Sequence, residues 1–208
     1  MNFFGLIFIG PNNWSANNVW IDEDNHVHLK ISHSPTAGWT CAELYTNVKF
    51  GFGTFRWFVE GAIDRFDTNV VLGLFTYGGL DGTNEIDIEV AKWGRKEPEA
   101  SNLFYTVYPR SLDVKQVSTG TLMSLQGTYT THLFNWTADY VAYESQYGFM
   151  TSPTENVFFT YQTPKNFTPS MPYIDAPLHM NLWSFQGKPP TDGQEVEVII
   201  HDFKYTKA

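Results

Sequence analysis

The stretch Glu85-Ile86-Asp87-Ile88-Glu89 alternates acidic and apolar side chains. Because successive side chains of a β-strand point to opposite faces, this alternation predicts a strand with Ile86 and Ile88 in a core and the three carboxylates together on the other face. Like charges at adjacent positions of one face repel each other, so at least one carboxyl group should keep its proton to a higher pH than a free one does. The stretch therefore predicts a half-buried β-sheet that carries an acidic patch.

The same period-2 alternation recurs on both sides of this stretch, and no long apolar pattern has the period of an α-helix. Turn-forming residues separate the candidate strands, as at 78–82 and 187–193. Many short strands without helices predict a single all-β domain over residues 1–208, a β-sandwich or jelly roll. We expect strands at residues 3–9, 27–31, 54–60, 70–77, 85–93, 102–108, 132–136, 140–144, 157–162, 178–185 and 195–205.

Composition and net charge indicate which classes of molecule the protein can bind. The chain has a formal net charge of −9, the wrong sign for nucleic acid or anionic membranes, so we expect neither as a partner. The apolar run at residues 3–9 is too short to span a bilayer and lacks the basic start and cleavage site of a leader. Aromatic residues make up 17% of the chain, which suits both a β-rich core and the stacking of sugar rings. We expect a monomer whose partner is neutral or cationic.

The carboxylate strand has two interpretations. A protonated acid beside an ionised carboxylate is the pair that cleaves glycosides. The backbone positions of residues four apart on a flat strand lie about 13 Å apart, whereas the carboxyl groups of a retaining pair lie roughly 5–5.5 Å apart, so the strand must curve until the side chains of Glu85 and Glu89 converge. The alternative is the exposed polar face of an ordinary strand, although Asp and Glu are poor strand formers.

Several segments, in the same order along the chain, resemble glycoside hydrolase family 16. The carboxylate strand matches the E-x-D-x-E signature of that family, and the family's lichenases resemble the chain well beyond it. The further matching segments are residues 14–19, 41–43, 50–55, 75–77, 81–83 and 180–183, with Asp202 in a similar final strand.

The resemblance implies a jelly roll of two curved antiparallel sheets with a substrate cleft on the concave face. It also implies a secreted, retaining endo-glycosidase acting on a β-linked polysaccharide, first of all a 1,3- or 1,3-1,4-glucan. Glu85 would be the nucleophile and Glu89 the general acid and later the base. Asp87 would hold the orientation and charge of the nucleophile. A non-catalytic, lectin-like carbohydrate-binding module on the same fold is the alternative, although a pure binder has no need of carboxylates that repel each other.

The residues that should line the cleft are predicted from strand alternation together with the family resemblance. In the strand at 178–185, the face that carries His179, Asn181 and Trp183 should line the cleft, since the resemblance puts Asn181 and Trp183 at the substrate. Trp93 would share the face of Glu89 if that strand continues regularly, and could stack on a sugar. The resemblance adds Glu43, Phe75 and Tyr77 as sugar contacts, with core packing as the alternative for Phe75 and Tyr77.

Departures from the lichenase pattern touch the substrate subsites. Thr83 stands where lichenases carry a Trp, and Tyr45 stands where they carry a substrate-binding Arg, so mixed-linkage glucan is in doubt as the substrate. Cys41 is the one cysteine, and Asn12 occupies the position of its usual disulfide partner, so we expect a free, buried thiol. The resemblance implies a reaction that requires no cofactor. A structural calcium ion is an expectation from the resemblance, with Asp202 as its candidate ligand and a plain surface carboxylate as the alternative.

Overall fold

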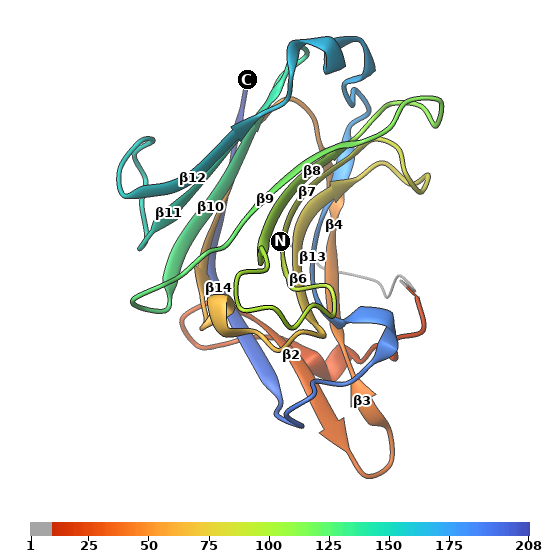
Figure 1. Cartoon of the computed structure of the whole chain (residues 1–208), viewed down its shortest axis with the longest axis vertical. Coiled ribbons are helices and arrows are strands. Elements are labelled where there is room, and N and C mark those ends of the chain that lie inside the picture. The colour runs from red at the N-terminus through yellow and green to blue at the C-terminus, as the bar shows by residue number, and fades with distance from the viewer. Residues whose placement is uncertain (1–9) are drawn as a thin grey trace.

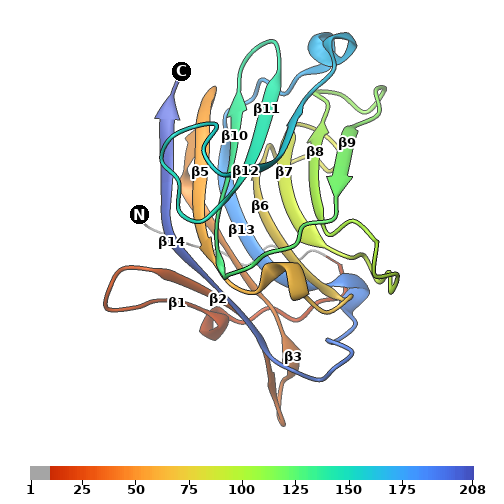
Figure 2. The same ribbon diagram turned by 60° about the vertical axis from the view of Figure 1, so that its left-hand side comes forward.

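The computed structural model describes residues 10–208, and the strand predicted at residues 3–9 lies outside them. Two antiparallel β-sheets stack face to face, and their strands bend along their length (Figures 1 and 2). This confirms the predicted all-β jelly roll of two curved sheets. Within residues 10–208, no helix has the length and apolar character that a membrane span requires.

The chain moves repeatedly between the two sheets. The larger sheet contains, in spatial order, β1 (Val19–Ile21), β2 (Val27–Ser34), β14 (Val196–Lys207), β5 (Gly53–Glu60), β10 (Tyr129–Trp136), β11 (Val141–Tyr147) and β12 (Val157–Gln162), with β3 (Gly38–Thr40) paired to β2. The smaller sheet has the order β4 (Ala42–Phe50), β13 (Ala176–Ser184), β6 (Val70–Tyr77), β7 (Glu85–Ala91), β8 (Leu103–Tyr108) and β9 (Val117–Thr121). The helical segments described are short 3₁₀ turns, η1 (Ala16–Asn18), η2 (Ile63–Arg65), η3 (Lys165–Ser170) and η4 (Phe185–Gly187).

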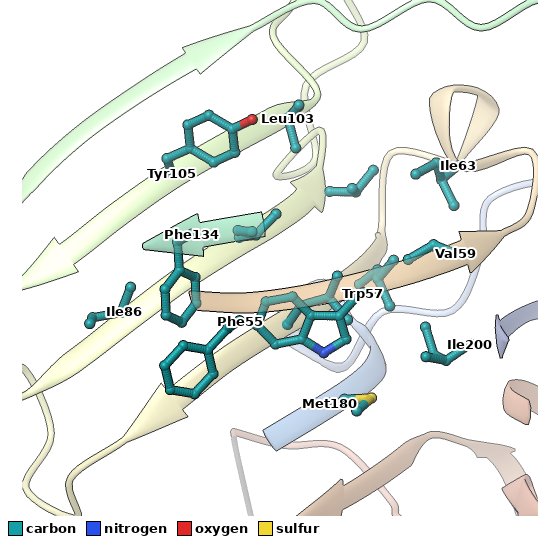
Figure 3. Close-up of a cluster of buried hydrophobic side chains, with 14 of the residues drawn as sticks. Phe55, Trp57, Val59, Ile63, Ile86, Leu103, Tyr105, Phe134, Met180 and Ile200 are labelled. Carbon is teal, nitrogen blue, oxygen red and sulfur yellow. The ribbon is translucent and has the colours of Figure 1, made fainter. Parts of the chain in front are cut away.

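The hydrophobic core fills the space between the sheets (Figure 3). One face of each central strand supplies it, which is why the alternation is visible in the sequence. Burying each large apolar side chain contributes roughly 1.5–3 kcal/mol of transfer free energy, so this layer fixes which face of β7 is left for the carboxylates. Labelled members of the cluster are Phe55, Trp57, Val59, Ile63, Ile86, Leu103, Tyr105, Phe134, Met180 and Ile200.

The strand predicted at residues 85–93 ends two residues early, at Ala91. Trp93 and Gly94 both have positive φ angles, 53° and 73°, so the chain turns there instead of continuing the pleat. The strand β9 was not predicted at all. Its sequence is Val-Ser-Thr-Gly-Thr, and its small polar side chains give little apolar alternation to detect.

Candidate active site

The central strand β7 lies between β6 and β8 and presents its carboxylates on the face away from the core. Ile86 and Ile88 are completely buried, as the alternation predicts. In the register of β6 and β7, Gly73 lies opposite Glu89, Phe75 opposite Asp87 and Tyr77 opposite Glu85. Because paired residues point to the same face of a sheet, these side chains share the open face.

A pocket of about 100 Å³ lies over this face. It brings together the three carboxylates and three of the predicted substrate contacts, which come from β6 and β13. Its lining residues are Gly73, Phe75, Glu85, Asp87, Glu89, Asn181 and Trp183. The face assigned to the strand at 178–185 is therefore correct for Asn181 and Trp183, since both open into the same pocket as the carboxylates.

Burial is the largest influence on all three carboxyl groups and raises the pKa of each. The charge of Glu85 raises the pKa of Asp87 and of Glu89 further. A hydrogen bond between Asp87 and Glu85 lowers the pKa of Glu85 and raises that of Asp87. The signs of these shifts fit a hydrogen bond that a protonated Asp87 donates to Glu85.

Two oxygen atoms in this group have no hydrogen-bond partner among the described residues. They are Oδ1 of Asp87 and Oδ1 of Asn181, and both are buried. An unpaired buried acceptor costs about 1–3 kcal/mol, so each is a candidate to accept a hydrogen bond from a bound molecule. Hydroxyl groups of a sugar would supply such donors.

Glu43, predicted as a sugar contact, lies opposite Asn181 in the register of β4 and β13 and therefore on the same face of the sheet. Its side chain is 0% exposed, and its Oε1 accepts a hydrogen bond from Nδ1 of His179 at 3.2 Å. Glu43 is not among the residues that line the pocket, since its side chain is fully covered and bonded to His179. Tyr77 also stays outside the pocket, where it lies half-buried and donates its hydroxyl to Asp81.

Trp93 lies next to the pocket, but not as part of the strand that was predicted to carry it. The premise that the strand continues regularly to Trp93 is wrong, since the chain turns at that residue. The indole instead packs against Trp183 at 6.2 Å and Phe185 at 5.5 Å between ring centroids. Trp93 therefore supports the aromatic side of the pocket from outside and is not one of its lining residues.

His179 is the residue of this region whose role the sequence did not reveal. Its ring stacks between those of Tyr45 and Phe75, with centroid distances of 5.2 and 4.9 Å. Strand parity placed His179 on the cleft face, but a single histidine in an alternating strand gives no signal of its partner. That partner, Glu43, is 136 positions away in the sequence.

Two further predicted residues lie away from the pocket. Cys41 is a buried free thiol that donates to Oδ1 of Asn12 at 3.4 Å, as expected. Asp202 has a side chain that is 51% exposed and pairs with Nζ of Lys204 at 3.3 Å. Within residues 10–208, Asp202 belongs to no cluster of three or more His, Cys, Asp or Glu side chains, so further ligands of a calcium ion there would be backbone carbonyls or water.

The fold is the curved jelly roll of solved β-glucanases. Bacillus licheniformis β-glucanase superposes with a TM-score of 0.70 and 19% sequence identity, covering 99% of this chain and 92% of that one. A lichenase from a mouse hindgut metagenome gives a TM-score of 0.67 at 19% identity, with coverages of 99% and 90%. A family 16 endo-glucanase from Bacteroides ovatus gives 0.67 at 14%, with coverages of 93% and 87%.

At these identities the likeness establishes the fold. No family model matches the sequence, and no curated protein matches it.

Proposed function

We propose that this protein is a retaining endo-glycosidase of the family 16 type that hydrolyses a β-linked glucan. The observation that carries the proposal is the pocket in which Glu85, Asp87 and Glu89 meet Asn181 and Trp183. The structural neighbours are glucanases, which supports carbohydrate as the class of substrate. The substrate would be neutral, because three clustered carboxyl groups repel an anionic polymer.

The proposed reaction proceeds in two displacements. In the first, a carboxylate oxygen of Glu85 attacks the anomeric carbon, the glycosidic C–O bond breaks, and Glu89 gives its proton to the departing oxygen. In the second, Glu89 takes a proton from water, the water oxygen attacks the same carbon, and the bond to Glu85 breaks. The raised pKa of Glu89 keeps the proton available for the first step, and Asp87 stabilises the ionised Glu85 through their hydrogen bond.

The proposal also covers where the protein acts, its oligomeric state and the linkage of its glucan substrate. A polysaccharide is too large to enter a cell intact, so we propose that the protein acts outside the cell, and as a monomer. Fractionation of the source organism and light scattering of the purified chain test these two points. Thr83 and Tyr45 replace the Trp and Arg that the lichenase resemblance would place at the substrate, so a plain 1,3-glucan is as good a candidate as a mixed-linkage one.

The decisive experiment incubates the protein with laminarin, lichenan, xyloglucan, agarose and carrageenan and measures reducing ends and product lengths. Release of a ladder of oligosaccharides from one β-glucan supports an endo-glucanase. NMR of the products at early times should show the β-anomer first, as retention requires. Binding of oligosaccharides without release of reducing ends from any polymer would instead support the non-catalytic carbohydrate-binding module.

A further inference from the structure

Glu43 and His179 form a buried pair beside the cleft. Glu43 lies on β4 and His179 on the neighbouring β13, and their side chains are 0% and 2% exposed. The second carboxyl oxygen of Glu43, Oε2, is buried and has no hydrogen-bond partner in the range 10–208. Because an unpaired buried carboxylate is costly, the single hydrogen bond from His179 is what fixes this side chain in place.

The ring of His179 is fixed from both sides. It is nearly parallel to the rings of Tyr45 and Phe75, with interplanar angles of 20° and 26°. Tyr77 adds an edge-on contact at 5.9 Å. A ring that is stacked on two faces and bonded through Nδ1 has lost its rotational freedom, so it can transmit a fixed position to its neighbours.

The register places this stack in one row with the candidate active site. Tyr45 is paired with His179, His179 with Phe75, and Phe75 with Asp87. Phe75 is the last ring of the row and lines the pocket itself. The position of the pocket wall beside Asp87 therefore depends on His179, which in turn depends on Glu43.

We propose that His179 is a positioning residue that sets substrate specificity, by holding Phe75 as an aromatic wall and by bonding the Glu43 carboxylate so that it stays covered beside Asn181. A sugar beside Asp87 then meets the ring of Phe75, whereas a free Glu43 would offer a hydrogen-bond acceptor in the neighbouring row, next to Asn181. This favours a saccharide that presents a ring face at that subsite. The inference deepens the proposed function and depends on it only for the identity of the ligand.

Two substitutions separate the two contacts of His179. His179→Phe keeps a stacking ring but removes the donor to Glu43, and His179→Gln keeps a donor but removes the ring. We expect each to raise KM for a β-glucan oligosaccharide about tenfold, since misplaced binding groups cost up to about a hundredfold, while kcat changes less. Glu43→Gln, which can still accept from Nδ1, should stay within about twofold of wild type. His33→Gln, at an exposed histidine on β2, is the matched control.

The role of His179 can be tested even if the protein is not a glycosidase, because binding can be measured in place of catalysis. If the wild-type protein binds oligosaccharides without cleaving them, the same variants are compared by their Kd in calorimetry, and the same tenfold loss is expected. Unchanged KM and Kd in both His179 variants would overturn the positioning role. If His179→Phe does not fold, His179→Gln decides: loss of thermal stability without any change in KM or Kd would show a structural role only.

Discussion

Gly73 lies directly opposite Asn181 in the register of β6 and β13, and a Cβ atom added at Gly73 would come within 2.5 Å of Asn181 Oδ1. The amide of Asn181 occupies the space that any other residue at position 73 would fill. Gly73 lies between Asn181 and Glu89 in one row of paired residues. Because Gly73 has no side chain, the amide of Asn181 can extend over it toward Glu89. The backbone at Gly73 has no positive φ angle, so the glycine serves this close approach and not a turn.

Gly73→Ala should therefore displace the Asn181 amide and weaken substrate binding. The clashing atom is the end of a side chain that can rotate, so the protein should fold with nearly unchanged thermal stability. We expect KM to rise by about tenfold, the order of effect that loss of one or two hydrogen bonds produces. Steady-state kinetics and thermal unfolding test this. Gly127→Ala, with open space around its Cβ, is the matched control, and an unchanged KM for Gly73→Ala would contradict the assignment.

Azide rescue should separate the roles of Glu85 and Glu89. Glu89→Ala should lose cleavage of natural glycosides yet still react with activated aryl glycosides, whose leaving groups need no proton. Azide should restore its turnover and give a β-glycosyl azide, because attack on the glycosyl-enzyme inverts the configuration a second time. In Glu85→Ala, azide should give the α-product directly. NMR of the azide products decides, and the opposite pair of anomers would exchange the two roles.

Asp87→Asn should be the mildest change among the carboxylates. Asn still offers an N–H to Glu85, so the support of the nucleophile survives in part, whereas Asp87→Ala removes it. We expect kcat to fall about tenfold in Asp87→Asn and by a further factor of about ten in Asp87→Ala, the range of one lost charge-assisted hydrogen bond. The Kd for an oligosaccharide product, measured by calorimetry, should stay nearly constant in Asp87→Asn. Complete loss of binding in that variant would argue against a supporting role.

His132 should make the protein less stable in acid. It is fully buried between Ser145 and Thr130, and burial lowers its pKa to about 3. The unfolded chain, with a histidine pKa near 6.5, binds a proton that the folded chain excludes as the pH falls below about 6.5. This one group should then reduce the free energy of unfolding by up to about 1.4 kcal/mol per pH unit between pH 6 and 4.

Urea denaturation of wild type and His132→Gln at pH 7, 6, 5 and 4 measures this contribution. The variant should be less stable at pH 7 but should lose less stability than wild type on acidification. His33→Gln controls for the removal of an exposed histidine. Parallel pH curves for wild type and His132→Gln would contradict the assignment.

Cys41 should react slowly with thiol reagents in the native protein. The thiol is 2% exposed, and burial raises its pKa, so little reactive thiolate is available at neutral pH. Labelling with a chromogenic disulfide should be complete within minutes in denaturant and should take hours without it. Rapid labelling of the native protein would show that the region around Asn12 and Ser184 opens.

The strand faces followed from the sequence, but the contacts between distant strands did not. Alternation in β7 correctly separated Ile86 and Ile88 from the carboxylates, and alternation in β13 put Asn181 and Trp183 on the pocket side, because the pleat has a strict period of two. It failed for Trp93, where the strand ends and periodicity no longer applies. The burial of Glu43 depends on His179, a contact made by strand pairing, which no local pattern encodes.

The position of β13 between β4 and β6 has a consequence for folding. Every pairing of β13 joins residues about 100 or more positions apart, so the side of the pocket that Asn181 and Trp183 form depends on contacts of high sequence separation. Until Ala176–Ser184 is available, β4 and β6 present unpaired edges, which invite association with other chains. Such topologies fold slowly, since the loop-closure entropy is lost before the contacts form. Activity should therefore emerge late in refolding, after most of the secondary structure, and a chaperone should improve the yield more than it changes the final stability.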